Sequence, residues 1–335
     1  MSTGLHPLAR VGRDGFDPGR CLPLGGSAHA WFEALHDGKG AVLVSADLDP
    51  AMRARLSGPR PDICGLSLDR PRVMGILNIT PDSFSDGGDL LAVKDAVARA
   101  KIMSQSADIL DIGGESTRPG ADEVTIAEEI GRVVPVIEGI RAAGIVTPIS
   151  IDTRKAPVAA AALDAGADMI NDVAAGRFDP EILCLAAERA APICLMHSIA
   201  DPKTMQSRAQ YGDVVTEVFD HLAERMAAAQ AAGIAPARII ADPGIGFGKT
   251  LQHNLSLLRE LSRYHGLGVP LLVGASRKRF IGEIGEAEVA RDRLGGSVAV
   301  ALHAADRGAH ILRVHDTYET RQALRLHLAL HERGE

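Results

Sequence analysis

Short apolar runs recur along the chain from residue 73 onwards. They cover residues 73–77, 109–112, 149–151, 169–170, 193–196, 239–241, 271–273 and 311–312. Short and continuous apolar runs are typical of parallel strands that are buried on both faces. The pattern therefore predicts eight parallel strands, all of them in the part of the chain that begins at Val73.

Segments predicted as helices follow these runs. They cover residues 90–105, 125–143, 155–165, 180–189, 213–232, 251–263, 287–305 and 317–332. Asp89 is a favourable N-cap for the first helix, and Gly144 and Gly233 stand where two others should end. Eight strands that are each followed by a helix favour an α/β fold of the (βα)8 TIM-barrel type over an open sheet. The first run lacks a following GxGxxG motif, which argues against a dinucleotide-binding fold.

Polar or charged side chains follow every one of the eight runs. They are Asn78, Glu115 with Thr117 and Arg118, Asp152, Asn171, His197, Asp242, Arg277 with Lys278, and Arg313 with His315. The active sites of such barrels lie on the loops at the carboxyl ends of the strands. We therefore expect these side chains to share one face of the molecule.

The N-terminal part of the chain, residues 1–70, does not follow this alternation and is rich in turn-forming Gly, Pro and Asp. Residues 28–35 are predicted as a short helix and residues 41–45 as a short strand. The expected division is an N-terminal extension over residues 1–70 and a barrel over residues 71–335. We expect the extension to pack on the barrel.

Composition narrows the possible functions. Aromatic residues make up only 3% of the 335 residues, so the core must consist mainly of Ala, Val, Leu and Ile. The net charge of −7 provides no overall basic field for nucleic acid. No apolar run approaches membrane-spanning length, and the N-terminus does not look like a signal peptide. We therefore expect neither nucleic acid nor a membrane as a partner.

The four cysteines, Cys21, Cys64, Cys184 and Cys194, form no CxxC pair. This spacing suggests neither a zinc site nor a disulfide framework. We expect the thiols to be reduced and the protein to be cytoplasmic. Neither Cys184 nor Cys194 has an obvious activating neighbour, and no Ser/His/Asp triad is visible.

The segment after the first run, NITPDSFSDGG over residues 78–88, is long for a loop of this type. Its Asn and Asp oxygens are hard ligands, suited to Mg²⁺ that is held mostly through substrate phosphates and water. The alternative is a turn-rich connector, since Thr-Pro-Asp and Asp-Gly-Gly are common in turns. Phe84 in such a loop favours the functional interpretation.

The segment after the second run, GGESTRPG over residues 113–120, combines hydroxyls, an Arg and glycine amides. This combination suits a phosphate oxygen. The alternative is a solvated turn that carries one surface arginine.

Residues 242–250, DPGIGFGKT, look like a phosphate-binding P-loop but have Pro243 where that motif needs glycine. Asp242 could cap a helix, yet the next helix begins near Thr250, too far along the chain. A carboxylate in this position can instead accept two parallel N–H groups from a flat heterocycle.

Bases cluster after the seventh run as Arg277, Lys278 and Arg279, in a region that often binds phosphate in barrels. The alternative is a charged surface segment, although it stands before Gly282, which we read as a helix breaker. Arg313 and His315 alternate along an extended chain, so their side chains should point the same way.

The remaining polar residues leave two interpretations open. His197 could be a satisfied core histidine, and Asp152 and Asn171 could be structural hydrogen-bonding groups. Their shared face with Asp242 favours a site that holds a polar heterocycle deep in the barrel and an anion at its rim.

At these motifs the chain resembles the dihydropteroate synthases of folate biosynthesis. The matching stretches are GILNITPDSFSDGG (75–88), DIGGESTRPGA (111–121), SIDTRK (150–155), IND (170–172), LMH (195–197), DPGIGFGK (242–249), GASRKRFIG (274–282) and RVHD (313–316). They occur in the order that the family shows, and the N-terminal extension lies outside the resemblance.

The resemblance implies a homodimeric transferase that uses Mg²⁺. Such enzymes condense 6-hydroxymethyl-7,8-dihydropterin pyrophosphate with p-aminobenzoate, which sulfonamides imitate, to give 7,8-dihydropteroate and pyrophosphate. Loss of pyrophosphate would leave a delocalised pterin-methyl cation, and the aromatic amine can attack it without a strong base. That SN1-like course explains why no triad is needed.

The resemblance also implies a role for each matching residue. The pterin would be bound by Asp152, Asn171, Asp242 and Lys278, with Arg277 stacked on its face and Met196 also contacting substrate. The pyrophosphate would be held by Asn78 through Mg²⁺ and by Arg118, Arg313 and His315. The p-aminobenzoate site would be shaped by Phe84, Thr117, Pro119 and Phe247. Some members have Ser where this chain has Arg279.

The sequence leaves two alternative functions open. A barrel methyltransferase acting on methyl-tetrahydrofolate would use a similar pterin pocket but would need neither the anion-binding rim nor the SFSDGG loop. A non-catalytic pterin-binding paralogue would not need all the matching site residues to be present, and here Asn78, Lys278 and His315 are among those present.

Overall fold

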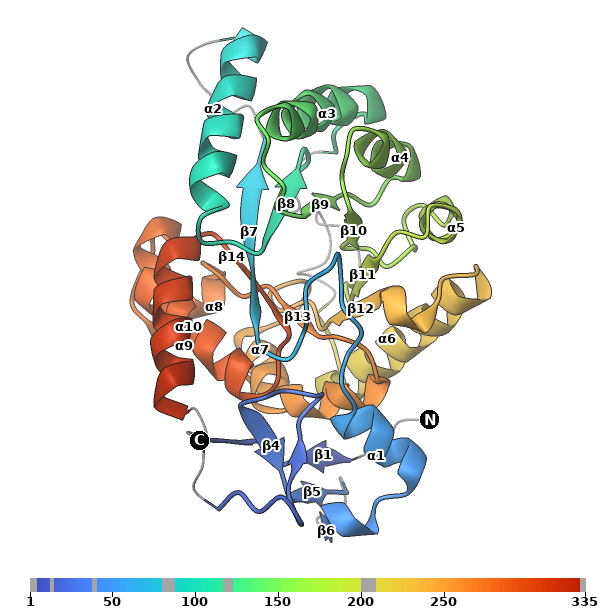
Figure 1. The fold of residues 1–335 in the computed structure, drawn as a ribbon, viewed down its shortest axis with the longest axis vertical. Coiled ribbons are helices and arrows are strands. Elements are labelled where there is room, and N and C mark those ends of the chain that lie inside the picture. The colour runs from blue at the N-terminus through green and yellow to red at the C-terminus, as the bar shows by residue number, and fades with distance from the viewer. Residues whose placement is uncertain are drawn as a thin grey trace.

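The computed structural model describes residues 5–12, 15–37, 41–79, 88–116, 123–199 and 209–331. Eight parallel strands form its central sheet: β7 (Arg72–Asn78), β8 (Ile109–Gly113), β9 (Ile149–Asp152), β10 (Met169–Asp172), β11 (Ile193–Met196), β12 (Ile239–Asp242), β13 (Leu272–Val273) and β14 (Ile311–Val314). Their order is β12-β11-β10-β9-β8-β7-β14-β13. A parallel bridge between Ala241 and Leu271 joins the two ends of this series. The sheet therefore closes, and the predicted (βα)8 barrel is confirmed (Figure 1).

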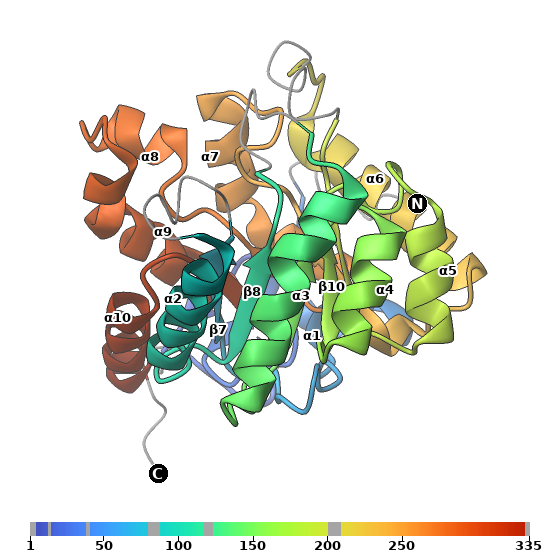
Figure 2. The same ribbon diagram turned by 90° about the horizontal axis from the view of Figure 1, so that it is seen from above.

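Helices pack around the outside of the barrel. They are α2 (Gly88–Met103), α3 (Ile126–Ala142), α4 (Ala156–Asp164), α5 (Glu181–Glu188), α6 (Val214–Ala231), α7 (Leu251–Arg259), α8 (Arg279–Ile284), α9 (Leu294–Asp306) and α10 (Thr317–His331). Figure 2 shows α2, α3 and α4 standing side by side against the sheet. The sequence predicts several ends correctly. Thr125 and Asp213 cap α3 and α6 through their side chains, and Gly144 and Gly233 follow these helices with positive φ.

Four helix predictions need correction. The segment predicted as one helix over 251–263 ends as α7 at Arg259 and continues as the 3-10 helix η4 (Leu261–Leu267). The helix expected from residue 287 begins only after the 3-10 turn η5 (Ala290–Arg293). Helix α2 already starts at Gly88, before the predicted start at residue 90, so Asp89 belongs to its first turn.

The fourth correction concerns Gly282, which lies inside α8 instead of ending a helix. A Cβ at this position would come within 2.4 Å of the Ala287 carbonyl oxygen and 2.5 Å of Arg293 Nε. Glycine is needed there because the chain packs closely, and not because the helix stops.

The barrel core is aliphatic, as the low aromatic content predicts. One layer of strand side chains points inward near the amino ends of the strands: Met74, Ile109, Met169, Cys194, Ile240, Leu272 and Ile311. Ile63 and Leu68 pack against this layer from the segment that precedes β7. Other strand residues pack outward against the helices in a larger cluster. The amino-terminal end of the barrel is therefore closed by the chain itself.

The N-terminal extension has its own small elements. They are β1 (His6–Pro7), β2 (Arg10–Val11), β3 (Leu22–Pro23), β4 (Ala30–Phe32), β5 (Ala34–His36), β6 (Val42–Val44), the turn η1 (Ser45–Asp47) and α1 (Pro50–Ser57). The strands form two small antiparallel sheets, β1-β5-β6 and β2-β4-β3. The helix predicted over residues 28–35 is wrong, because this segment forms β4, which pairs with β2 and β3, and β5, which pairs with β1 and β6. The strand expected at 41–45 corresponds to β6.

The extension lies beside the barrel, drawn in blue in Figure 1. His29 Nε2 is 3.0 Å from the carbonyl oxygen of Ala305, and His310 Nε2 is 3.0 Å from that of Gly25. Ser262 Oγ donates to the Pro7 carbonyl oxygen at 2.8 Å. The extension thus contacts η4, the end of α9 and the start of β14.

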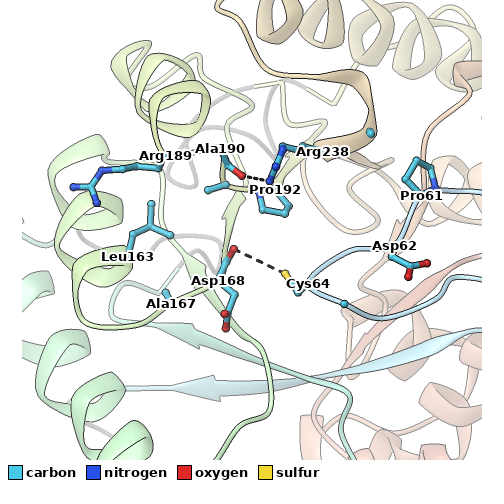
Figure 3. A pocket seen from close by; sticks show the side chains of 13 residues that line it. Pro61, Asp62, Cys64, Leu163, Ala167, Asp168, Arg189, Ala190, Pro192 and Arg238 are labelled. Carbon is cyan, nitrogen blue, oxygen red and sulfur yellow. Dashed lines mark hydrogen bonds between the residues drawn. The ribbon is translucent and has the colours of Figure 1, made fainter.

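A cavity of about 590 Å³ lies at the end of the barrel where the strands begin (Figure 3). Its lining combines residues 61–65 with the segments before β10, β11 and β12. Cys64 Sγ contacts the Asp168 carbonyl oxygen there, at 3.9 Å. This cavity is remote from the carboxyl ends of the strands. Within the described part of the chain, no helix is both long and apolar enough to span a membrane.

Candidate active site

The predicted site residues converge because neighbouring strands end in register. Asn78 pairs with Gly113, Gly113 with Asp152, and Asp152 with Asn171. On the other side Met196, the last residue of β11, pairs with Asp242, the last residue of β12. The side chains that the sequence singled out at the ends of separate runs therefore meet at one mouth of the barrel.

A buried ion cluster occupies the centre of this mouth. Arg313 donates from Nε to Asp111 Oδ2 and from Nη2 to Asp152 Oδ2, both at 2.6 Å. The Asn171 amide lies 3.3 Å from Asp111 Oδ2. Asp111 is fully buried and is absent from the residues predicted from the sequence. A carboxylate inside the apolar run 109–112 was the signal that could have identified it.

Asp152 carries one acceptor atom that none of the described residues satisfies. Its Oδ1 is buried and has no hydrogen-bond partner among the described residues. Burial raises the pKa of the Asp152 carboxyl to about 7; Arg313 opposes this shift, and the neighbouring Asp111 adds to it. A buried polar atom without a partner is costly. The atom is therefore a candidate contact for a ligand N–H group.

Asp242 lies across the mouth from Asp152 and is also buried. Its Oδ1 accepts the backbone N–H of Gly244 at 2.7 Å. Burial raises the pKa of Asp242 to about 6, while the Gly244 bond and Lys278 oppose the shift. Burial lowers the pKa of the Lys278 ammonium to about 7, assisted by Arg313 and opposed by Asp242. Burial therefore disfavours the charged form of both Asp242 and Lys278.

Lys278 and Phe247 form one wall of the site. The Lys278 ammonium lies 3.9 Å from the centre of the Phe247 ring, a cation–π contact. Gly246, with φ of +83°, lets the loop approach this lysine, since a Cβ there would come within 2.8 Å of Lys278 Cδ. The two predicted residues are thus brought together.

Arg277 is held against Asp316. Arg277 Nε lies 3.0 Å from Asp316 Oδ2, and Nη2 bonds the other carboxylate oxygen. Its φ of +59° is uncommon for a residue with a side chain, and the backbone N–H donates to Ser297 Oγ. Asp316, which the sequence did not single out as a site residue, therefore orients the guanidinium.

Arg313 and His315 have separate partners. While Arg313 enters the ion cluster, His315 Nδ1 lies 3.1 Å from Ser276 Oγ, which also accepts the His315 backbone N–H at 3.2 Å. Both residues lie on or directly after β14.

His197 is a satisfied buried histidine, one of the two interpretations left open by the sequence. Its Nδ1 lies 2.9 Å from Lys249 Nζ, and its backbone N–H donates to the Asp242 carbonyl oxygen at 3.0 Å. Burial and the adjacent Lys249 lower its pKa far below the usual value. It is therefore neutral and faces Lys249.

Asn78 ends β7 and is half-buried. Its Oδ1 lies above Gly113, where a Cβ would be 3.5 Å away. In the described segments no group of three or more His, Cys, Asp or Glu side chains could hold a metal ion. Asn78 thus offers one amide oxygen to a metal at this mouth.

The second loop is anchored by buried charges at both ends. Glu115 Oε1 accepts the Val124 backbone N–H at 3.0 Å and lies 3.2 Å from Lys155 Nζ. Lys155 also bonds Glu129 at 2.7 Å, and Arg154 bonds Glu115 at 3.2 Å. The predicted residues Phe84, Thr117, Arg118 and Pro119 lie outside the described residues.

Comparison with known proteins agrees with this geometry. The family model described as "Pterin binding enzyme" matches residues 74–315. The chain is 49% identical over 265 residues to the dihydropteroate synthase of Escherichia coli, covering 78% of this chain and 92% of that protein.

Solved structures give the same result. The Xanthomonas albilineans dihydropteroate synthase with 4-aminobenzoic acid superimposes with a TM-score of 0.76 at 50% identity, covering 81% of this chain and 98% of that one. The same enzyme in complex with 7,8-dihydropteroate gives a TM-score of 0.73 at 48% identity with the same coverage.

Proposed function

The chain belongs to the dihydropteroate synthase family, and from this membership we propose how its barrel performs the reaction. The enzyme is a transferase that joins 6-hydroxymethyl-7,8-dihydropterin pyrophosphate to p-aminobenzoate, with release of pyrophosphate. The relatives favour this activity over the methyltransferase alternative, because the Escherichia coli and Xanthomonas albilineans proteins are dihydropteroate synthases.

The buried polar cluster binds the pterin. Asp152, Asn171 and Asp242 converge on the barrel mouth, and Asp152 Oδ1 lacks a partner among the described residues. This orphaned acceptor is the single observation that best supports the proposal, because an aminopyrimidine edge supplies an N–H donor of the kind that the described residues do not offer to it. Lys278 donates to a ring acceptor, and Met196 provides an apolar contact.

Asp111 and Asp316 support the binding groups without contacting the pterin directly. Asp111 holds Arg313 and Asn171, so it orients two groups of the pocket at once. Asp316 holds Arg277 at the edge of the site, from which the guanidinium covers the pterin face. The two carboxylates extend the set of functional residues beyond those predicted.

The leaving pyrophosphate is bound by His315 and Arg118 at the rim and by Arg313, whose guanidinium also joins the buried cluster with Asp111 and Asp152. Asn78 offers one amide oxygen, which fits Mg²⁺ that keeps several waters and binds mainly through phosphate oxygens. Such an ion, when bound, neutralises charge on the pyrophosphate. The carbon–oxygen bond to the pyrophosphate breaks, and its electron pair leaves with the oxygen. The arylamine then forms the carbon–nitrogen bond to the pterin-methyl cation and loses a proton to water.

The p-aminobenzoate subsite lies against Phe247 and Lys278, beside the pterin pocket. The cation–π contact between them fixes the aromatic wall on which the arylamine packs. The resemblance assigns Phe84, Thr117 and Pro119, which lie outside the described residues, to this subsite, and loops over it would keep water from the reactive cation.

We place the enzyme in the cytoplasm as a homodimer that is formed through its outer helices. All four cysteines are free, as expected for a reducing compartment. Helix α10 exposes the apolar side chains of Tyr318, Leu326 and Leu330 at helical spacing. Light scattering on the wild type and on Leu326→Glu tests the dimer, because a buried glutamate would dissociate it. Monomeric wild-type protein would refute it.

Pyrophosphate release from the pterin pyrophosphate, with and without p-aminobenzoate, tests the reaction. We expect release that depends on the arylamine and yields dihydropteroate in equal amount. Asp220→Ala, on the exposed face of α6, serves as a control with wild-type rates. Absence of arylamine-dependent release from the wild type would refute the activity.

A further inference from the structure

We propose that Lys249 is a positioning residue whose buried ammonium shapes the loop between β12 and α7, and so holds Phe247 in place for the arylamine. The proposal deepens the function given above and rests on it. None of the residue roles that the resemblance implies belongs to this lysine.

Lys249 has a complete set of acceptors inside the protein. Its side chain is 4% exposed. Nζ lies 2.9 Å from His197 Nδ1, 2.8 Å from the Gly244 carbonyl oxygen and 3.0 Å from the Phe247 carbonyl oxygen. A protonated lysine has three donors, so the three short contacts match its capacity. A fourth contact, to the His197 carbonyl oxygen, is longer at 3.4 Å.

The loop wraps around this ammonium. Gly244, Gly246 and Gly248 all have positive φ, at +66°, +83° and +58°. A Cβ on Gly244 would lie 2.0 Å from the His197 carbonyl oxygen, so the loop presses directly on the end of β11. Such a tight turn points carbonyl groups inward, and the ammonium compensates their partial negative charge.

Charged and titratable groups on the neighbouring elements act on Lys249 and are affected by it. Burial lowers the pKa of Lys249 to about 7; Asp242 on β12 raises it and Lys278 after β13 lowers it. His221 on α6 and His253 on α7 each feel the charge of Lys249, which contributes to lowering their own pKa values. His197 stays neutral and accepts from the ammonium.

The loop in turn carries functional groups. Lys249 binds the carbonyl group of Phe247, whose ring packs under the Lys278 ammonium. Gly244, bound through its carbonyl oxygen, donates its N–H to Asp242 Oδ1. Removal of the ammonium therefore disturbs the aromatic wall first. Asp242 is affected less, because strand β12 also holds it.

Two other contacts keep the loop attached when the ammonium is lost. Asn254 Oδ1 accepts the Gly246 N–H at 2.6 Å, and the Tyr211 hydroxyl donates to the Gly248 carbonyl oxygen at 3.1 Å. Lys249→Met keeps the length of the side chain but leaves the acceptors around Nζ without their donor, and each group left unsatisfied lowers the stability of the fold. The two remaining contacts and the packing of the barrel should still allow the variant to fold.

The decisive experiment compares steady-state kinetics of wild type, Lys249→Met and the control Lys94→Met, which alters an exposed lysine on α2. We expect Lys249→Met to raise KM for p-aminobenzoate about tenfold, as for the loss of one charge-assisted hydrogen bond. Pterin affinity by calorimetry should change by less than about threefold, because β9, β10 and β12 still position its carboxylates. Lys94→Met should match the wild type.

A second variant separates the charge from the packing. Lys249→Ala leaves room for a small cation, so ammonium chloride should lower its KM for p-aminobenzoate, and sodium chloride at equal ionic strength should not. An unchanged KM in Lys249→Met, a failure of both variants to fold, or equal effects of the two salts would overturn the proposal. An inactive wild type would refute the proposed function instead.

Discussion

Substitution of Asp152 by Asn should stabilise the ligand-free protein while removing pterin binding. The folded-state pKa of Asp152 is about 7, against 3.8 for an unperturbed carboxyl. Ionisation of this carboxyl at pH 8 therefore lowers the free energy of unfolding by ~4 kcal/mol. In the variant, Arg313 donates to a neutral oxygen instead of a carboxylate. This change lowers stability by only ~1–2 kcal/mol, because the Asn oxygen can still accept the hydrogen bond. The variant should then be ~2 kcal/mol more stable at pH 8.

The sign of the pH dependence makes this prediction specific. Because the pKa is raised on folding, the folded state retains the proton between pH 4 and pH 7 while the unfolded chain releases it. Wild-type stability therefore falls as pH rises through this window, and this part of the fall should be missing in the variant.

Urea denaturation of ligand-free wild type and Asp152→Asn at pH 5 and pH 8 measures the difference. We expect the gain in stability of the variant to be larger at pH 8 by ~2–3 kcal/mol. A variant that is less stable than the wild type at pH 8 would show that the Arg313 ion pair, and not burial, determines the energy of this carboxylate.

Three further predictions address the site and the extension. Asp242→Ala should fold but lose ~3–6 kcal/mol of pterin binding by calorimetry, since two charge-assisted hydrogen bonds disappear; unchanged affinity would sink the assignment. A sulfonamide should bind more tightly when Mg²⁺ and pyrophosphate are present, by ~1–3 kcal/mol of coupling; equal titrations in both conditions would mean that the arylamine site is preformed. A chain that starts at Asp69 should lose stability to urea, because Ile63 and Leu68 no longer cover the inner apolar layer, at ~2–5 kcal/mol for each large side chain. If this shortened chain folds without turnover, the extension contributes to the site.

The barrel was predictable because its signals are local. A buried parallel strand is a continuous apolar run, and caps such as Thr125 and Asp213 lie next to the helices they begin. The extension was harder to predict, because β4 and β5 are stabilised by pairing with β2 and β3 and with β1 and β6, and not by signals within residues 28–35. A helical interpretation of residues 28–35 followed from local composition alone.

The site was predictable where polar groups stand at strand ends and less so where they are hidden. Asp111 lies within an apolar run that otherwise indicates only a strand. The contact of Lys249 with His197 joins positions far apart in the sequence, so it depends on the closed barrel. Asp316 was visible in the RVHD motif, but its partnership with Arg277 depends on two separate loops.

The separation between the closed end of the barrel and its mouth bears on how such an enzyme can evolve. Ile63 and Leu68 pack on the inner apolar layer at one end, while the substrate groups stand on loops and strand ends at the other. A substitution in a mouth loop that weakens an inhibitor leaves this apolar layer untouched. Substitutions that confer drug resistance can therefore change ligand recognition at the mouth, while the packing at the opposite end of the molecule continues to stabilise the fold.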